Sequence, residues 1–245
     1  MNAIRPGEHA VALSEAGKTS TESTATKAAT GKPVGGAGAA LSTHRIEAFS
    51  DGVLSIAITL LVLQLSIPIV SATAADAELS RRLIEMLPKL FSYVISFAIV
   101  GIFWVGHHSL FHFIICADRS LLWLNNLFLL CVGFIPFPAA LLGAYGTRRV
   151  AVIVYGASLA LTGLTLALIW KYATHDRRLV SDDLDPQAVR SGLRRILLGP
   201  ALYGVSMVLC FVSVWISLAI YVIVPLIYIL PGRIDRHWRR STEAG

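Results

Sequence analysis

Five stretches that lack Asp, Glu, Lys and Arg constrain this chain more than any other feature, because together they cover more than half of its 245 residues. A bilayer core of about 30 Å takes about 20 helical residues, so each of the first four stretches fits one crossing. The fifth would reach about 55 Å as a single helix, and we interpret it as two crossings joined near residues 215–218. The sequence therefore predicts an all-α integral membrane protein with six transmembrane helices. The stretches are residues 52–75, 90–117, 120–147, 150–170 and 196–232.

This pattern divides the sequence into three parts. Residues 44–232 form the predicted six-helix membrane domain. Residues 1–43 are rich in Ala, Gly, Ser and Thr and lack the apolar run of a secretory signal, so we expect a disordered cytoplasmic leader. Residues 233–245 form a basic tail, which we also expect to be cytoplasmic.

Prolines indicate where two of the crossings end or bend. We expect the first crossing to end at Pro68, because its ring and missing N–H interrupt a helix, and Pro136 and Pro138 to bend the third. Between the first two crossings, the segment DAELSRRLIEML predicts a short amphipathic helix. The expected bounds of the first four crossings are residues 44–68, 88–112, 120–145 and 150–170.

The basic balance of the chain, a net charge of +6, raises the question of nucleic-acid binding. The basic residues flank the membrane segments and do not gather in a compact domain, so we attribute them to membrane topology and expect no nucleic-acid partner. Near the membrane, 13 Lys and Arg residues fall on one side and 5 on the other. The positive-inside rule then predicts that both termini are cytoplasmic, in a multi-pass protein of the cell inner (plasma) membrane.

Asp51 lies at the start of the first charge-free stretch, where an ionised carboxylate must be paired, hydrated or protonated. Arg45 is the nearest basic residue, but six helical residues place the two side chains about 120° apart around the helix. They would therefore reach different helices or subunits. In the alternative interpretation, Asp51 caps the helix and Arg45 extends to the lipid headgroups.

Beyond Asp51, residues at helical spacing form a stripe along the first crossing: Gly52, Ile56, Thr59, Leu60 and Leu63. The small residues would allow close helix approach. The stripe either packs within an ordinary bundle or lines a pore with hydrophobic constrictions that control wetting.

Polar residues in the second and third crossings offer partners for Asp51. His108 and His112 have a spacing that can bind a metal, but no HExxH glutamate or third ligand accompanies them, so we expect no metal site. Asn125 and Asn126 are amides at membrane depth and need hydrogen-bond partners. The predicted topology brings His107 and these amides to the end of the bundle where the first helix begins.

Three segments of the sequence resemble parts of one known family of membrane proteins. Arg45, Phe49, Ser50 and Asp51 form an RxxxFSD motif followed by GVLSIAITLLVL, which resembles the signature and first helix of the transmembrane protein 175 family, potassium-permeable channels of endolysosomes and prokaryotes. FWVGHHSLF is similar to the W-x-x-H stretch of the family's second helix, and WLNNLFLLCVGFIPF to its third. A single six-helix unit is similar to the prokaryotic members, which assemble as tetramers.

The resemblance implies a homotetrameric cation channel whose central pore is walled by four copies of the first helix. It implies that the constriction falls to Ile56, Thr59, Leu60 and Leu63, since no TVGYG filter occurs in the chain. It further implies that an inter-helix network holds the pore helices in place, and it requires no cofactor. The expected network residues are Arg45, Phe49, Ser50, Asp51, His107 and Asn125.

The resulting prediction is passive, non-enzymatic flow of K⁺ with modest selectivity over Na⁺, in contact with membrane lipids. A proton-coupled secondary transporter that uses Asp51 and the histidines is the main alternative. A membrane enzyme with a metal at His107, His108 and His112, and a structural membrane protein without transport, are two others.

Overall fold

The computed structural model describes residues 43–69 and 76–229, in which the regular elements are all helices. The expected leader (1–43) and tail (233–245) therefore lie outside the described residues, apart from Thr43. Of the two units into which the chain divides, residues 1–38 and 39–245, the described residues belong to the second. The elements are α1 (Thr43–Leu60), η1 (Leu61–Gln64), α2 (Asp76–Glu85), α3 (Leu87–Phe111), α4 (Arg119–Phe134), α5 (Pro136–Tyr145), α6 (Arg149–Thr174), η2 (His175–Arg177), α7 (Pro186–Leu209) and α8 (Val214–Ile229).

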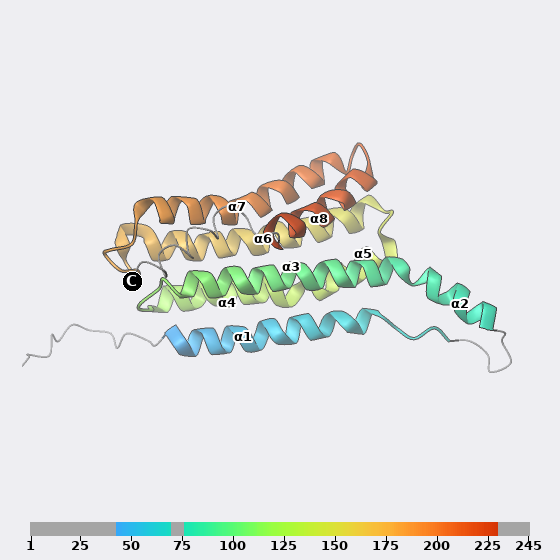
Figure 1. Ribbon diagram of the computed structural model, residues 1–245, viewed down its shortest axis with the longest axis horizontal. Coiled ribbons are helices and arrows are strands. Elements are labelled where there is room, and N and C mark those ends of the chain that lie inside the picture. Colours follow the sequence, from blue (N-terminus) through green and yellow to red (C-terminus); the bar gives the residue numbers. More distant parts are fainter. Residues whose placement is uncertain (1–42, 70–75, 230–245) are drawn as a thin grey trace, which may run out of the picture. The chain divides into compact units, whose positions relative to one another are not determined.

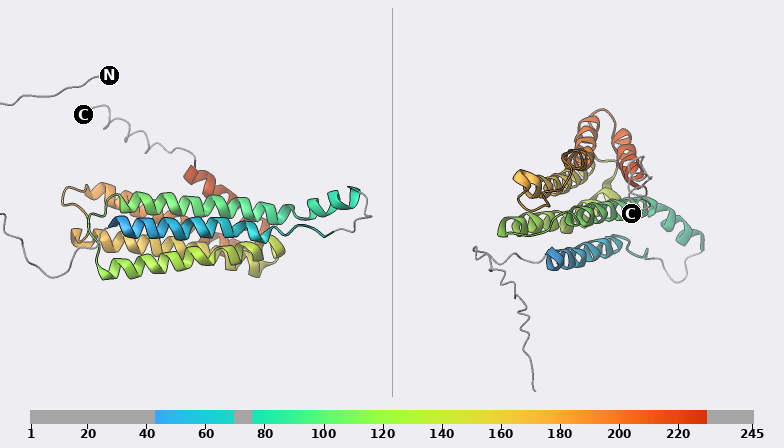
Figure 2. Two further views of the ribbon diagram at one scale, coloured as in Figure 1. Left: turned by 90° about the horizontal axis from the view of Figure 1, so that it is seen from below. Right: turned by 60° about the vertical axis from the view of Figure 1, so that its left-hand side comes forward.

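The long helices run side by side, and α1 lies at one edge of the bundle (Figure 1). Within the chain α1 packs on α3 and α4, α4 packs on α6, and α6 packs on α7 (Figure 2). The start of α1, the end of α3, the start of α4 and the start of α7 all lie at the same end of the bundle (Figure 1). The polar residues near these helix ends can therefore meet.

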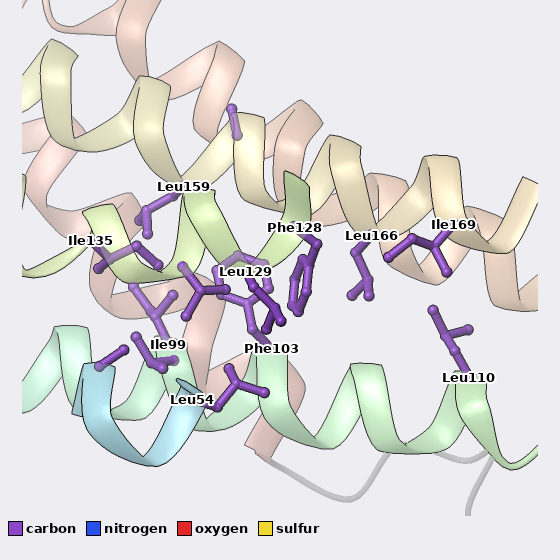
Figure 3. Packing of buried hydrophobic residues seen from close by; sticks show 14 of the residues in the cluster. Leu54, Ile99, Phe103, Leu110, Phe128, Leu129, Ile135, Leu159, Leu166 and Ile169 are labelled. Carbon is purple, nitrogen blue, oxygen red and sulfur yellow. The ribbon is translucent and has the colours of Figure 1, made fainter. Parts of the chain in front are cut away.

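An apolar core holds these helices together. Leu54 of α1, Phe103 of α3, Phe128 of α4 and Leu159 of α6 are all buried and belong to one hydrophobic cluster (Figure 3). Leu54, Phe128 and Leu159 are each 0 % exposed. Because lipid is as apolar as these side chains, close packing and inter-helix hydrogen bonds contribute more to this assembly than the hydrophobic effect does.

Within residues 43–69 and 76–229, five helices are long and apolar enough to cross a membrane, with α4 and α5 together counting as one. The sixth expected crossing corresponds to α8, which is apolar and has 16 residues, about 24 Å of helix, within the described part of the chain. The chain is therefore a multi-pass membrane protein, and a sixth crossing stays a prediction. The turn between the last two helices was wrongly predicted near residues 215–218, since it lies at residues 210–213, where the α7 ladder ends.

The first crossing also ends earlier than predicted. The α-helix stops at Leu60 and tightens into the 3₁₀ turn η1, which ends at Gln64 rather than at Pro68. The residue before a proline avoids the α conformation, so Ile67 cannot continue the helix. The third crossing is interrupted at Ile135 between α4 and α5, as the prolines that follow it predict.

The amphipathic segment between the first two crossings forms α2, which has no buried residues. Arg81 forms ion pairs with Glu78 and Glu85 along the helix surface, each with a nitrogen–oxygen distance of 2.7 Å. Exposed pairs of this spacing stabilise a helix by a few tenths of a kcal/mol each. The polar segment between the last two charge-free stretches, residues 171–195, is partly helical, since α6 extends to Thr174 and α7 begins at Pro186.

The contact between α6 and α7 depends on a glycine. A Cβ on Gly163 would lie 2.6 Å from Cγ and 2.9 Å from Cδ of Pro200. We expect Gly163→Ala to lower the free energy of unfolding by about 1–2 kcal/mol, because the rigid proline ring cannot move aside without displacing α7. Thermal unfolding of the detergent-solubilised protein measures this. Gly204→Ala is the matched control, since a Cβ there meets nothing within 4 Å, and equal melting temperatures for the two variants would contradict the prediction.

Candidate functional site

The first helix has two different faces. Ile46, Ser50, Leu54 and Ala57 are buried against the rest of the chain. The opposite face holds all four residues of the predicted constriction, Ile56, Thr59, Leu60 and Leu63, and all four are exposed. Ile56 is 59 % exposed and Leu63 is 73 % exposed. A membrane helix thus presents a continuous stripe of apolar side chains and one hydroxyl that the described residues of its own chain do not cover.

The local geometry changes along this stripe. Thr59 donates its hydroxyl to the carbonyl of Ile56 at 2.9 Å, which leaves the lone pairs of Oγ1 free to accept or to face an ion. Leu60 ends the α-helix, and Leu63 lies in the 3₁₀ turn. In a 3₁₀ turn, side chains three residues apart eclipse one another, so Leu60 and Leu63 lie nearly in line.

Behind the stripe, a buried chain of hydrogen bonds joins α1, α4 and α3. The Ser50 hydroxyl donates to the carbonyl of Ile46 at 2.8 Å and accepts a bond from Nδ2 of Asn125 at 2.9 Å. Oδ1 of Asn125 lies 2.9 Å from Nε2 of His107. Ser50, Asn125 and His107 are each at most 1 % exposed.

The Ser50 hydroxyl determines which group donates in each of these hydrogen bonds. Because its hydroxyl hydrogen is used on Ile46, Ser50 must accept from the amide nitrogen of Asn125, and the amide oxygen then faces His107. His107 therefore carries a proton on Nε2 and donates it. The imidazole also stacks on Phe111 and Phe128, with ring centroids 4.3 Å and 5.3 Å away. Hydrogen bonds and ring stacking thus fix the orientation of His107.

A direct hydrogen bond between side chains also joins α3 to α1. Nε1 of Trp104 donates to Oδ1 of Asp51 at 2.9 Å. Trp104 was not among the predicted site residues, although it lies one helical turn before His107 in the W-x-x-H stretch, and that spacing is the signal that could have identified it. Asp51 is therefore paired with an indole on a neighbouring helix and not with Arg45.

The other predicted site residues do not join this network. Arg45 and Phe49 are exposed, and Phe49 is 58 % exposed. Arg45 forms no ion pair within residues 43–69 and 76–229. Asn126, which the sequence analysis treated as a second buried amide, is exposed, so only Asn125 of the two lies inside the bundle. In the described part of the chain, no three His, Cys, Asp or Glu side chains cluster as metal ligands would.

One polar residue that the sequence analysis did not single out is Gln64, the last residue of η1. Its amide nitrogen and oxygen are both buried and have no hydrogen-bond partner within the described residues. We expect Gln64→Met to raise the free energy of unfolding by about 1 kcal/mol, since it keeps the volume and removes two unpaired polar atoms. Thermal unfolding measures the change. A lower melting temperature would mean that the amide is paired in the assembled protein.

Known proteins match the part of the chain that contains this site. The model of the family described as endosomal/lysosomal potassium channel TMEM175 matches residues 45–136, which contain α1 from Arg45 onward and all of α2, α3 and α4. A protein named as a potassium channel from Chamaesiphon minutus is 36 % identical over 191 residues, which are 77 % of this chain and 94 % of that protein. The chain belongs to the TMEM175 family.

Two further relatives agree with the family assignment. A protein named as a potassium channel from Streptomyces collinus is 35 % identical to this TMEM175 chain over 188 residues, covering 75 % of this chain and 90 % of that protein. The crystal structure of a lysosomal potassium-selective channel TMEM175 homolog from Chamaesiphon minutus superposes with a TM-score of 0.67 at 34 % identity. It covers 77 % of this chain and 96 % of the homolog. The family and these relatives are ion channels and not enzymes.

Proposed function

We propose that this chain forms a potassium channel in which α1 of four identical copies lines a central pore. The observation that carries the proposal is the exposed stripe of Ile56, Thr59, Leu60 and Leu63 on a helix whose other face is packed on α3 and α4. Membership in a family of potassium channels supports K⁺ as the permeant ion. Assembly around the stripe would cover its apolar side chains.

The chemistry of the stripe accounts for passive and weakly selective conduction. Rings of isoleucine and leucine offer an ion no ligands that replace its water, so ions pass partly hydrated, and pore width and wetting control the current. Strong discrimination between K⁺ and Na⁺ requires carbonyl or charged ligands, which this stripe lacks. We therefore propose modest selectivity for K⁺ over Na⁺, with Thr59 supplying the one ring of hydroxyl groups.

In this proposal, the residues that form hydrogen bonds between α1 and its neighbouring helices position α1. Ser50 and Asp51 tie the buried side of α1 to Asn125 and Trp104, and so determine how far the helix is rotated about its axis. Arg45 and Phe49, which remain exposed on the single chain, are available for contacts with neighbouring copies.

We propose that the channel lies in the plasma membrane and that both of its termini are cytoplasmic. The excess of Lys and Arg on one side of the membrane supports it. The described chain also begins with α1 and ends with α8 running in opposite directions (Figure 1).

Potassium flux into vesicles containing the purified protein tests the function. We expect uptake of K⁺ down its gradient without a proton gradient, together with a mass in solution of four chains. Flux that requires an imposed proton gradient would favour the proton-coupled transporter, and the absence of flux from a folded tetramer would contradict a channel.

The role of Asp51 is tested with Asp51→Ala, which removes the oxygen that accepts the indole N–H of Trp104. We expect the ratio of K⁺ to Na⁺ flux to be preserved, while the tetramer or the opening of the pore is weakened, because Asp51 bonds to Trp104 behind the stripe. Reversal potentials in mixed K⁺ and Na⁺ solutions measure the ratio. A change in selectivity alone would place Asp51 in the ion path.

A further inference from the structure

A large apolar cavity lies between α3, α6, α7 and α8, on the side of α3 that also carries Trp104. Its volume is about 890 Å³, within the range of pockets that bind small molecules. Ile102, Phe103, Gly163, Leu166 and Tyr203 are among its lining residues. The function proposed above makes no use of this cavity.

The α7 wall of the cavity carries Arg195, which is the one charged side chain among the described lining residues. Its lining residues recur every three or four positions, as one face of a helix does. Ser191 and Arg195 lie in the half of α7 nearer its start, and Ile196, Pro200 and Tyr203 follow toward its end. The cavity therefore has the polarity of a site for an amphiphile, with the exposed Arg195 at its edge, which we call its mouth, and mostly apolar side chains elsewhere.

Tyr228 of α8 shapes the wall at this point. Its hydroxyl accepts a bond from the Gly199 amide at 3.1 Å and donates to the Arg195 carbonyl at 2.6 Å. These two backbone groups pair with each other in a regular helix. Pro200, the next residue, has no N–H for the carbonyl four positions earlier, so α7 is already weakened here. Tyr228 thus hydrogen-bonds two backbone groups of α7 beside the cavity.

The mouth carries an unpaired positive charge. The Arg195 side chain is exposed, and no Asp or Glu forms an ion pair with it within residues 43–69 and 76–229. A guanidinium at the edge of a membrane protein binds the phosphate oxygens of anionic lipids well, because its planar donors match them. The complement of this mouth is an anion joined to an apolar chain.

We propose that the cavity binds one anionic phospholipid of the surrounding membrane, with an acyl chain among the apolar side chains and the phosphate at Arg195. Trp104 lines the cavity and donates to Asp51 of α1, so the bound lipid would touch a residue that orients the first helix. We therefore expect the lipid to change ion flux, and this second part rests on the proposed channel function.

Binding is tested on the full-length protein by native mass spectrometry in detergent with added phosphatidylglycerol. We expect one lipid per chain, preferred over phosphatidylcholine, and about tenfold weaker binding for Arg195→Gln. Arg194→Gln is the matched control, because Arg194 is also exposed on α7 but does not line the cavity. It should bind as the unmodified protein does. Ala188→Trp, at an exposed position that lines the cavity, should weaken binding by obstruction.

Three results would overturn the inference. These are no preference for phosphatidylglycerol, equal weakening by Arg194→Gln and Arg195→Gln, and equally tight binding of a free fatty acid, which would replace the phospholipid as the occupant.

Potassium flux in vesicles with and without phosphatidylglycerol tests the second part. We expect the lipid to change the flux of the unmodified protein and to have no effect on Arg195→Gln. Binding without any flux in either membrane would contradict the channel and leave the lipid site standing. Flux without lipid binding would contradict the site and leave the channel standing.

Discussion

Ile56→Asn is expected to raise K⁺ flux by about tenfold. Four amide groups in place of four apolar side chains would hold water at the constriction, and a barrier lower by about 1.4 kcal/mol gives this increase. The asparagine side chain has the same number of non-hydrogen atoms as the isoleucine side chain, so the pore width should change little. Flux into vesicles, normalised to the amount of tetramer, measures the effect.

Ile56→Val is the matched control, because it keeps the ring apolar and removes a single methylene group. We expect its flux to remain far below that of Ile56→Asn. Unchanged or lower flux of Ile56→Asn in an intact tetramer would show that Ile56 does not line the ion path.

Asn125→Leu is expected to lower the free energy of unfolding by about 3 kcal/mol. The change leaves the Nε2–H of His107 without an acceptor and removes the donor to Ser50, and both groups are buried. A buried polar atom that loses its partner costs about 1–3 kcal/mol. Chemical or thermal unfolding in detergent, followed by tryptophan fluorescence, measures the loss.

The neighbouring residue provides a control with the same chemistry. Asn126 lies one position further along α4 and is exposed, so Asn126→Leu removes an amide from the same helix without opening the network. Equal unfolding free energies for the two leucine variants would contradict the role assigned to Asn125.

Much of the fold could be predicted because charge is so costly in lipid that its absence marks the membrane segments. The ends of α3, at Leu87 and Phe111, lie within one residue of the predicted crossing. The end of α1 was predicted less well. Pro68 is visible in the sequence, but the early change to a 3₁₀ turn depends on a local bond from the Leu65 amide to the Val62 carbonyl, which the pattern of apolar residues does not contain.

The candidate site, too, could be predicted only in part from the sequence. The spacing of Ile56, Thr59, Leu60 and Leu63 is a property of one helix, so it puts them on one face without knowledge of the rest of the chain. The contact of Trp104 with Asp51 joins residues 53 positions apart and depends on how α1 and α3 are rotated against each other. Likewise, only packing distinguishes the buried Asn125 from the exposed Asn126.

The 3₁₀ turn at the end of α1 links backbone winding to the width of a pore lined by this helix. Successive residues turn by about 120° in a 3₁₀ helix and by about 100° in an α-helix, so rewinding the three steps from Leu60 to Leu63 would swing Leu63 by about 60° around the axis. Leu60 would keep its direction. A rearrangement of four residues is therefore large enough to take one ring of leucines out of line with the other.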